Sequence, residues 1–193
     1  MARDRSKRPE AKPLRLFVAV EVPPSVRDAI DETIAPWRTA FPRVRWVPPE
    51  NWHITMKFLG ATFPRLRGWV EAAVGRAAVQ QPSFETRLRR LGSFPTPGRA
   101  RVLWVGPDAE VEPLSALAAA LEDELAAKFP RERRAFHPHL TVARSDPPLR
   151  LPSAFAETPL DAGPFVVERL ALFRSHLRRP APTYEPLATF PLG

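Results

Sequence analysis

Two copies of a His-x-Thr-x motif contain the side chains best suited to chemistry in this chain. The first is His53-Ile54-Thr55-Met56 and the second is His139-Leu140-Thr141-Val142, each within an alternating apolar run that predicts a β-strand. Histidine titrates near neutral pH, so two histidines can supply the acid and the base that cleave a phosphoester without a metal or a covalent intermediate. The motifs therefore predict a two-histidine site.

Strand geometry predicts how each motif presents its side chains. Residues i and i+2 of a strand point to the same face, so each histidine should lie beside its threonine while the apolar residues between them face the core. If the two halves pack about a pseudo-twofold axis, His53 and His139 face one another across a groove. Flanked by the hydroxyl donors of Thr55 and Thr141, that groove would fit one tetrahedral phosphate.

The same alternation makes predictions for the residues that follow each motif. It directs Lys57 into the groove and Phe58 into the core, although Phe58 could stack a base if the strand turns at the next two residues. Arg144 has the opposite parity to His139, so it reaches phosphate only if its strand ends or twists. Arg134 lies five residues before His139, and simple surface charge is one interpretation of all three cations.

The two motifs occupy equivalent places in an apparent duplication. Aligning Phe17 with Leu103 puts each histidine 36 residues downstream, since 17 leads to 53 and 103 leads to 139. Apolar patterns and turn residues predict strands over 14–22, 44–47, 52–59, 84–91, 101–105, 135–144, 165–175 and 183–192. Helices are predicted from an N-cap at Ser25 to about residue 40, over 67–79 and from 114 to about 129, with a loop over 147–164.

Composition indicates a globular protein with a surface that attracts anions. The chain has 193 residues, 44% hydrophobic and 26% charged, and a formal net charge of +8, which favours RNA or phosphorylated ligands as partners. Genomic base composition is an equal alternative explanation of the arginine excess. Residues 1–12 form a basic arm, solvated or in transient contact with RNA, and 13–193 a single domain. The absence of cysteine excludes disulfides and a thiolate nucleophile. Without a signal-like segment or a membrane-length apolar run, we expect a cytoplasmic protein, and a monomer by default.

A metal site is the alternative use of these histidines. His137 has the same strand parity as His139, but the His-Pro-His segment together with His53 lacks a carboxylate ligand nearby in the sequence. We therefore expect no metal. His176 has no comparable context and is expected at the surface.

Longer stretches around the motifs resemble one enzyme family. The segments RLFVAVEVP, RWVPPENWHITMKFLG, RVLWVG, RAFHPHLTVAR, LALFRSHL and YEPLATFPL, in that order, span nearly the whole chain. They resemble the RNA 2',3'-cyclic phosphodiesterases of the two-histidine phosphoesterase superfamily, formerly described as LigT-like 2'-5' RNA ligases. The resemblance implies an α+β, bilobal, duplicated fold in which two antiparallel sheets line a central cleft and helices lie outside.

The resemblance also implies roles for the site residues. His53 would donate a proton to the departing 3'-oxygen, His139 would accept one from water, and Thr55 and Thr141 would donate hydrogen bonds to the non-bridging oxygens. The product would be a 2'-phosphomonoester of RNA or a nucleotide, and no metal or nucleotide cofactor would be needed. Arg134 and Arg144 match places where the family tends to keep arginine, so both could hold phosphate. Two alternatives remain open: 2'-5' ligation of tRNA halves, and binding of phosphorylated RNA ends without turnover.

Overall fold

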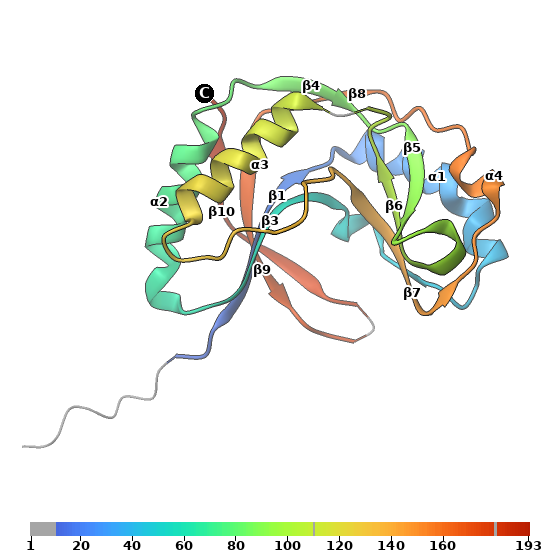
Figure 1. The fold of residues 1–193 in the computed structure, drawn as a ribbon, viewed down its shortest axis with the longest axis horizontal. Helices are drawn as coiled ribbons and strands as arrows, with labels where there is room; N and C mark the ends of the chain where they lie inside the picture. Colours follow the sequence, from blue (N-terminus) through green and yellow to red (C-terminus); the bar gives the residue numbers. More distant parts are fainter. Residues whose placement is uncertain (1–10, 110, 180) are drawn as a thin grey trace, which may run out of the picture.

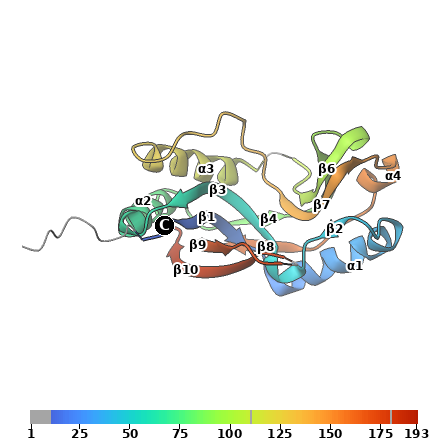
Figure 2. The ribbon, with the colours of Figure 1, turned by 90° about the horizontal axis from the view of Figure 1, so that it is seen from below.

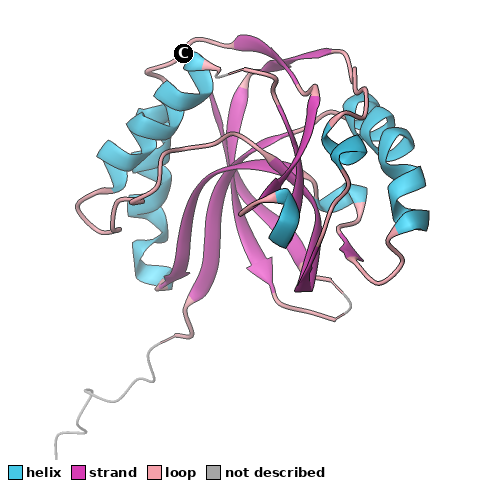
Figure 3. Ribbon diagram, turned by 45° about the vertical axis from the view of Figure 1, so that its right-hand side comes forward, coloured by secondary structure: helices cyan, strands magenta, loops and turns pink. Residues whose placement is uncertain are grey.

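Two groups of antiparallel strands, joined edge to edge, form the centre of the molecule, with helices on either side (Figure 3). This computed structural model describes residues 11–109, 111–179 and 181–193. The predicted basic arm at 1–12 therefore lies almost entirely outside the described residues. Among the described residues, no helix combines the length and apolarity needed to cross a bilayer.

The first lobe of the sheet contains both ends of the described chain. Its strand order is β10-β9-β1-β3, and the bounds are β10 Thr183–Pro191, β9 Arg169–His176, β1 Leu14–Glu21 and β3 His53–Thr62. The second lobe has the order β7-β6-β5, with β2 also paired to β7; its strands are β7 Leu140–Leu149, β6 Ala100–Gly106, β5 Arg90–Phe94 and β2 Arg45–Trp46. The antiparallel pair Ile54–Leu140 joins β3 to β7, so the lobes meet where the two His-x-Thr-x motifs lie.

Helices cover the two lobes in pairs. The α-helices are α1 Pro24–Ala40, α2 Arg67–Ala78, α3 Glu112–Leu125 and α4 Ser153–Ala156, and the short 3-10 helices are η1 Pro49–Asn51, η2 Pro64–Leu66 and η3 Pro97–Arg99. Figures 1 and 2 show α2 and α3 together beside the first lobe, and α1 and α4 together beside the second. Apolar residues three or four positions apart explain the burial of these helices, as in α3, which buries Leu114, Leu117, Leu121 and Leu125.

Each helix of the duplicated unit crosses to the opposite lobe. α1 follows β1 of the first lobe, yet its Trp37 packs edge-on against Phe155 of α4 and donates a hydrogen bond to Thr158 at 3.1 Å. α3 follows β6 of the second lobe, yet its Glu124 pairs with Arg76 of α2 at 2.7 Å. The exchange of helices interlocks the two halves of the chain.

The α+β class and the antiparallel sheets predicted from the sequence are confirmed, and the two lobes form one continuous sheet. A separate small sheet pairs β4 (Phe84–Arg87) with β8 (Pro164–Val167). The predicted strand over 165–175 is wrong as a single element, because the chain passes at Glu168 from β8 to β9 in a different sheet. The predicted strand over 84–91 likewise divides into β4 and β5.

Element boundaries differ from the prediction in several places. Ser25 is not the N-cap of α1, since Pro23 caps the helix and Pro24 begins it, a position where the missing proline N–H costs nothing. β3 continues past Gly60, whose φ of 66° lies in the left-handed region that glycine adopts readily. β7 begins at Leu140 rather than near residue 135, and the predicted loop over 147–164 contains the end of β7 and helix α4.

Candidate active site

A cavity of about 580 Å³ lies where the two lobes meet, and both motifs line it. The register of the Ile54–Leu140 pair explains how the motifs come together. In an antiparallel ladder the residues that flank such a pair come opposite each other, so His53 is placed opposite Thr141 and Thr55 opposite His139. The four side chains therefore surround one position, with the two histidines on a diagonal, and each of the four lines the cavity.

Backbone carbonyls orient both imidazoles in the same way. Nδ1 of His53 donates to the carbonyl oxygen of Asn51, and Nδ1 of His139 donates to the carbonyl oxygen of His137, each at 2.8 Å. A carbonyl oxygen can only accept, so Nδ1 must carry a proton in both rings. In each neutral histidine, Nε2 then carries the free lone pair that can accept a proton.

His53 has more contacts with Phe and Tyr rings than His139 has. The Phe17 ring stacks on His53 with centroids 4.8 Å apart, and Tyr184 meets the same imidazole edge-on at 5.2 Å. His139 has an edge-on contact with Phe94 at 5.0 Å. Such ring contacts restrict rotation of the imidazoles about their side-chain bonds.

Burial in this aromatic setting lowers the pKa of both histidines. Loss of hydration lowers the pKa of His53 from 6.5 to about 4; its backbone hydrogen bond opposes this shift, and the charges of His139 and Arg144 add to it. Burial lowers the pKa of His139 as well, with smaller contributions from His137 and Arg144. Both rings are therefore neutral in the free protein at pH 7.

A β-bulge follows each motif and reverses the alternation of side chains. On β3, Val18 of β1 pairs with Lys57 and Ala19 pairs with Thr55, so Met56 has no partner. On β7, Leu103 of β6 pairs with Ala143 and Trp104 with Thr141, so Val142 has no partner. Because a bulge inserts one extra residue, the side chain that returns to the groove lies three positions after the threonine instead of two.

The bulges correct three predictions made from strict alternation. Phe58 is not a core residue: its side chain is 64% exposed and lines the cavity. Arg144 is exposed and lines the cavity too, on the same face as Thr141. Lys57 turns away from the groove and is 6% exposed.

Lys57 is instead part of a buried ion pair behind the sheet. Its Nζ lies 2.6 and 2.7 Å from the two carboxylate oxygens of Glu122 on α3, and 2.8 Å from the carbonyl oxygen of Pro130. All three hydrogen atoms of the ammonium group thereby have acceptors inside the protein. This position gives Lys57 a role in packing α3 against β3.

The predicted arginines differ in their relation to the cavity. Arg134 is exposed and is not among the residues that line it, whereas Arg144 is. Arg45 of β2 pairs directly with Arg144 of β7 and also lines the cavity. Two like charges facing each other across a ladder repel, so this pair favours an anion between or above them.

Sequence reasoning missed several residues of the cavity wall. Tyr184 is the one tyrosine of the chain, and burial raises the pKa of its hydroxyl. Asn51 lies in the turn before the first motif, and its side chain donates to the carbonyl oxygen of Pro182 at 2.8 Å. The wall also includes Arg15, Leu177, Arg178 and Arg179. Proximity in sequence could have indicated Asn51, but the remaining residues reach the cavity through pairing of distant strands.

Acidic groups do not contribute to this wall. Among the cavity residues within the described part of the chain there is no Asp or Glu, while five are arginine: Arg15, Arg45, Arg144, Arg178 and Arg179. Within residues 11–109, 111–179 and 181–193, no three His, Asp or Glu side chains are grouped so that they could hold a metal ion. The wall is therefore suited to an anionic ligand.

Comparison with known proteins gives the family. A model of the 2'-5' RNA ligase superfamily matches residues 26–179. Proteins named RNA 2',3'-cyclic phosphodiesterase are similar along most of the chain: one from Thermus thermophilus is 35% identical over 93% of this chain and 90% of its own length. One from Methanothermobacter thermautotrophicus is 31% identical over 93% and 99%. In a third, from Geobacillus stearothermophilus, 30% identity extends over 91% of this chain, which spans 56% of that longer protein.

Solved structures have the same fold. The crystal structure of TT0787 from Thermus thermophilus matches with a TM-score of 0.76 and 34% identity, over 93% of this chain and 98% of that one. E. coli LigT in its apo form also has a TM-score of 0.76, with 28% identity over 94% and 99%. The sequence resemblance is confirmed by these matches, and the protein belongs to the 2'-5' RNA ligase superfamily.

Proposed function

We propose that this protein hydrolyses terminal 2',3'-cyclic phosphates of RNA to 2'-phosphomonoesters. The observation that carries the proposal is the diagonal arrangement of two identically oriented histidines and two threonines around one position in a basic cavity. The names of its relatives support the same reaction. LigT, a structural neighbour, has been crystallised with 3'-AMP and with phosphate, which supports a nucleotide phosphate as ligand.

Acid and base catalysis is assigned to the two Nε2 atoms. A water molecule attacks the phosphorus and gives its proton to Nε2 of His139, while the bond from phosphorus to the 3'-oxygen breaks. The departing oxygen takes the proton from Nε2 of protonated His53, and exchange with solvent restores both rings. Each of these proton transfers typically contributes about 10² to 10⁴ in rate.

Hydrogen bonds to the phosphate supply the remaining stabilisation. Thr55 and Thr141 lie on opposite strands, so their hydroxyls can donate to different non-bridging oxygens as charge grows on them in the pentacoordinate state. Arg144, whose charge already acts on both histidines, adds a cation beside the phosphate. The negative substrate should also raise the low pKa of His53, so that binding itself favours the protonated acid.

Phosphorus NMR of a short RNA that ends in a 2',3'-cyclic phosphate tests the reaction directly. The protein, His53→Ala and His139→Ala are each incubated with the RNA in the presence of EDTA. We expect conversion to a 2'-monoester by the unaltered protein and a loss of at least about 10² in rate in each variant. An unchanged cyclic phosphate would refute the proposal, and conversion that EDTA abolishes would refute its metal-independent form.

Ligation is a second candidate, favoured by one observation. Both histidines are held in the same tautomer by equivalent carbonyl bonds, so either can begin as acid or as base. A 5'-hydroxyl could then replace water as the attacking group. Supplying tRNA halves with and without a free 5'-hydroxyl separates the two reactions, because only the first set can be joined.

Binding of RNA ends without turnover is the non-catalytic alternative. In that case His53→Ala would leave RNA affinity unchanged with no activity to lose. A cytoplasmic location and a monomeric state stay predictions from the sequence, and size-exclusion chromatography with light scattering measures the latter.

A further inference from the structure

The tip of the hairpin formed by β9 and β10 carries a group of exposed side chains with no role in the chemistry above. Leu177 is 76% exposed, Arg178 and Arg179 are exposed, and all three line the cavity that contains the histidines. Figure 1 shows this hairpin projecting from the body of the molecule, beyond the ends of the neighbouring strands.

Charged side chains on the stem of the hairpin form ion pairs, but the arginines at its tip do not pair with any described residue. On the stem, Glu185 accepts from His176 at 2.8 Å and lies 3.8 Å from Arg174. At the tip, neither Arg178 nor Arg179 has an ion pair or side-chain hydrogen bond with any described residue. Exposed guanidinium groups without a carboxylate are available to bind phosphate.

The number of charges decides between a short ligand and a long one. A terminal 2',3'-cyclic phosphate is a diester and carries one negative charge. The cavity wall carries five arginines and no described acidic side chain. Arg144 is sufficient to balance the cyclic phosphate, so the other four are in excess for a mononucleotide and fit a ligand with several phosphates along a chain.

Apolar side chains beside the arginines point to single-stranded nucleic acid. Of the four large hydrophobic side chains exposed on the described residues, Phe58 and Leu177 line this cavity. Proteins that hold single strands combine cations along the backbone with apolar or aromatic surfaces against the bases.

The hairpin tip is also hydrogen-bonded to the turn that precedes β3. Asn51 donates through its side chain to the carbonyl oxygen of Pro182 in the tip, while its own carbonyl accepts from His53. A ligand on the tip is therefore held at a constrained position relative to the acid histidine.

We propose that the tip, residues Leu177, Arg178 and Arg179, binds nucleotides upstream of the cyclic end. Arg178 and Arg179 contact their phosphates, and Leu177 provides an apolar surface for a base. The protein thereby prefers RNA chains over mononucleotides. This inference rests on the proposed function and assigns to the hairpin a binding step that the chemistry itself does not require.

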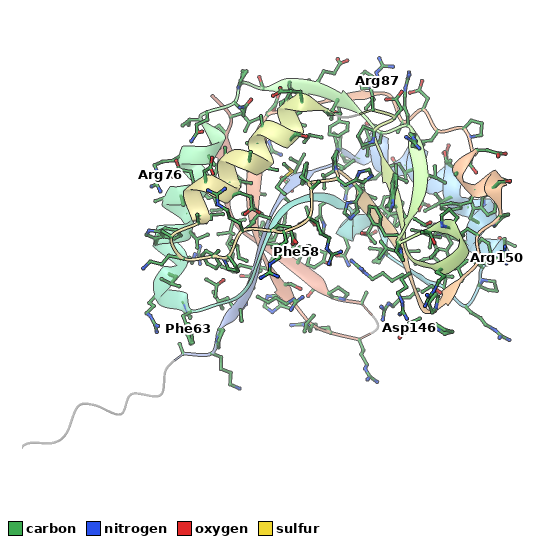
Figure 4. All side chains as sticks on the ribbon, in the orientation of Figure 1. Phe58, Phe63, Arg76, Arg87, Asp146 and Arg150 are labelled. Atoms are coloured by element: carbon green, nitrogen blue, oxygen red, sulfur yellow. The ribbon has the colours of Figure 1, made fainter. Side chains whose placement is uncertain are left out.

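The test compares two substrates and two double variants. The substrates are cytidine 2',3'-cyclic phosphate and a ten-nucleotide RNA with the same end. The variants are Arg178→Ala/Arg179→Ala and a matched control, Arg87→Ala/Arg150→Ala, whose exposed arginines lie at the periphery, well away from Phe58 (Figure 4). We expect the hairpin variant to lose about 5- to 30-fold in kcat/KM on the RNA, as two exposed phosphate contacts would. Activity on the mononucleotide should be unchanged, and the control should match the unaltered protein on both.

Salt dependence gives a second measure of the same contacts. Removing two phosphate contacts should reduce the slope of log affinity against log salt by about 1.4. An equal loss on both substrates, or no loss on the RNA, would overturn the inference.

Direct binding separates this inference from the proposed function. If the unaltered protein hydrolyses neither substrate, the proposed function fails, and fluorescence anisotropy with the ten-nucleotide RNA ending in a 2'-phosphate still tests the hairpin. Weaker binding by the hairpin variant than by the control would support it, and equal binding would refute it.

Discussion

Replacing Lys57 should weaken folding and leave catalysis intact. The Lys57 side chain is 6% exposed and that of its partner Glu122 is 19% exposed, so Lys57→Met leaves a largely buried carboxylate and the Pro130 carbonyl without their donor. Breaking a buried pair costs about 3 to 5 kcal/mol, and the partial exposure of Glu122 places this case near about 3 kcal/mol. For a chain of this length, that loss lowers Tm by about 6 to 12 °C.

Urea denaturation and turnover of a cyclic mononucleotide check the two halves of this prediction. The unfolding free energy should fall by about 3 kcal/mol, while kcat/KM at a temperature where the variant is folded stays within about threefold of the original. Lys57→Met/Glu122→Leu should recover most of the stability, because a buried pair can be replaced by apolar side chains at little cost.

An exposed ion pair provides the matched control. Arg101 and Asp146 lie 2.9 Å apart with side chains 53% and 81% exposed, so Arg101→Met should cost at most about 1 kcal/mol. A Lys57→Met protein as stable as the original, with KM raised tenfold or more, would refute the reasoning. It would mean that Lys57 faces the substrate.

Three further predictions concern the cavity. Because the pKa of His53 is lowered to about 4 and that of His139 is lowered too, the bell-shaped profile of kcat/KM should peak below pH 6.5; a maximum above pH 7 would contradict this assignment. The pKa of His53 in the folded protein lies below its value of 6.5 in the unfolded chain. About 3 kcal/mol of unfolding free energy is therefore present above pH 6.5 and is lost as the pH falls towards 4. His53→Gln should flatten the dependence of the unfolding free energy on pH over that range, and an unchanged slope would argue against it. Phe58→Ala should raise KM for a cyclic nucleotide by about 5- to 100-fold through lost stacking, yet leave KM for ribose 2,3-cyclic phosphate unchanged; equal effects on both would exclude base stacking.

The sequence was sufficient to predict the features that depend on local repetition. The strands around both motifs, the helices α1, α2 and α3, and the equivalence of His53 with His139 follow from apolar periodicity and from two similar segments. The α+β class follows from the resemblance. These features depend on residues close together in the chain.

The side-chain directions beyond each motif could not be predicted, because they depend on partner strands. A bulge is defined by the register of two strands, and neither Met56 nor Val142 differs in type from an ordinary strand residue. Strict alternation therefore assigned Lys57 to the groove and Phe58 to the core. The cavity residues Arg178, Arg179 and Tyr184 were missed because pairing of β9 with β10 and of β9 with β1 brings them to the site from the far end of the chain.

The two bulges have a consequence for how a duplicated protein can specialise. Phe58 and Arg144 occupy equivalent positions: they are 86 residues apart, as are the two histidines, and each is the first groove residue after its bulge. A symmetric dimer of half-length chains, exchanging helices as α1 and α3 do here, would have to place the same side chain at both positions. A single chain is free of that constraint. One copy can present an aromatic ring to a base and the other a cation to a phosphate, and the site gains a direction along which a strand of RNA can lie.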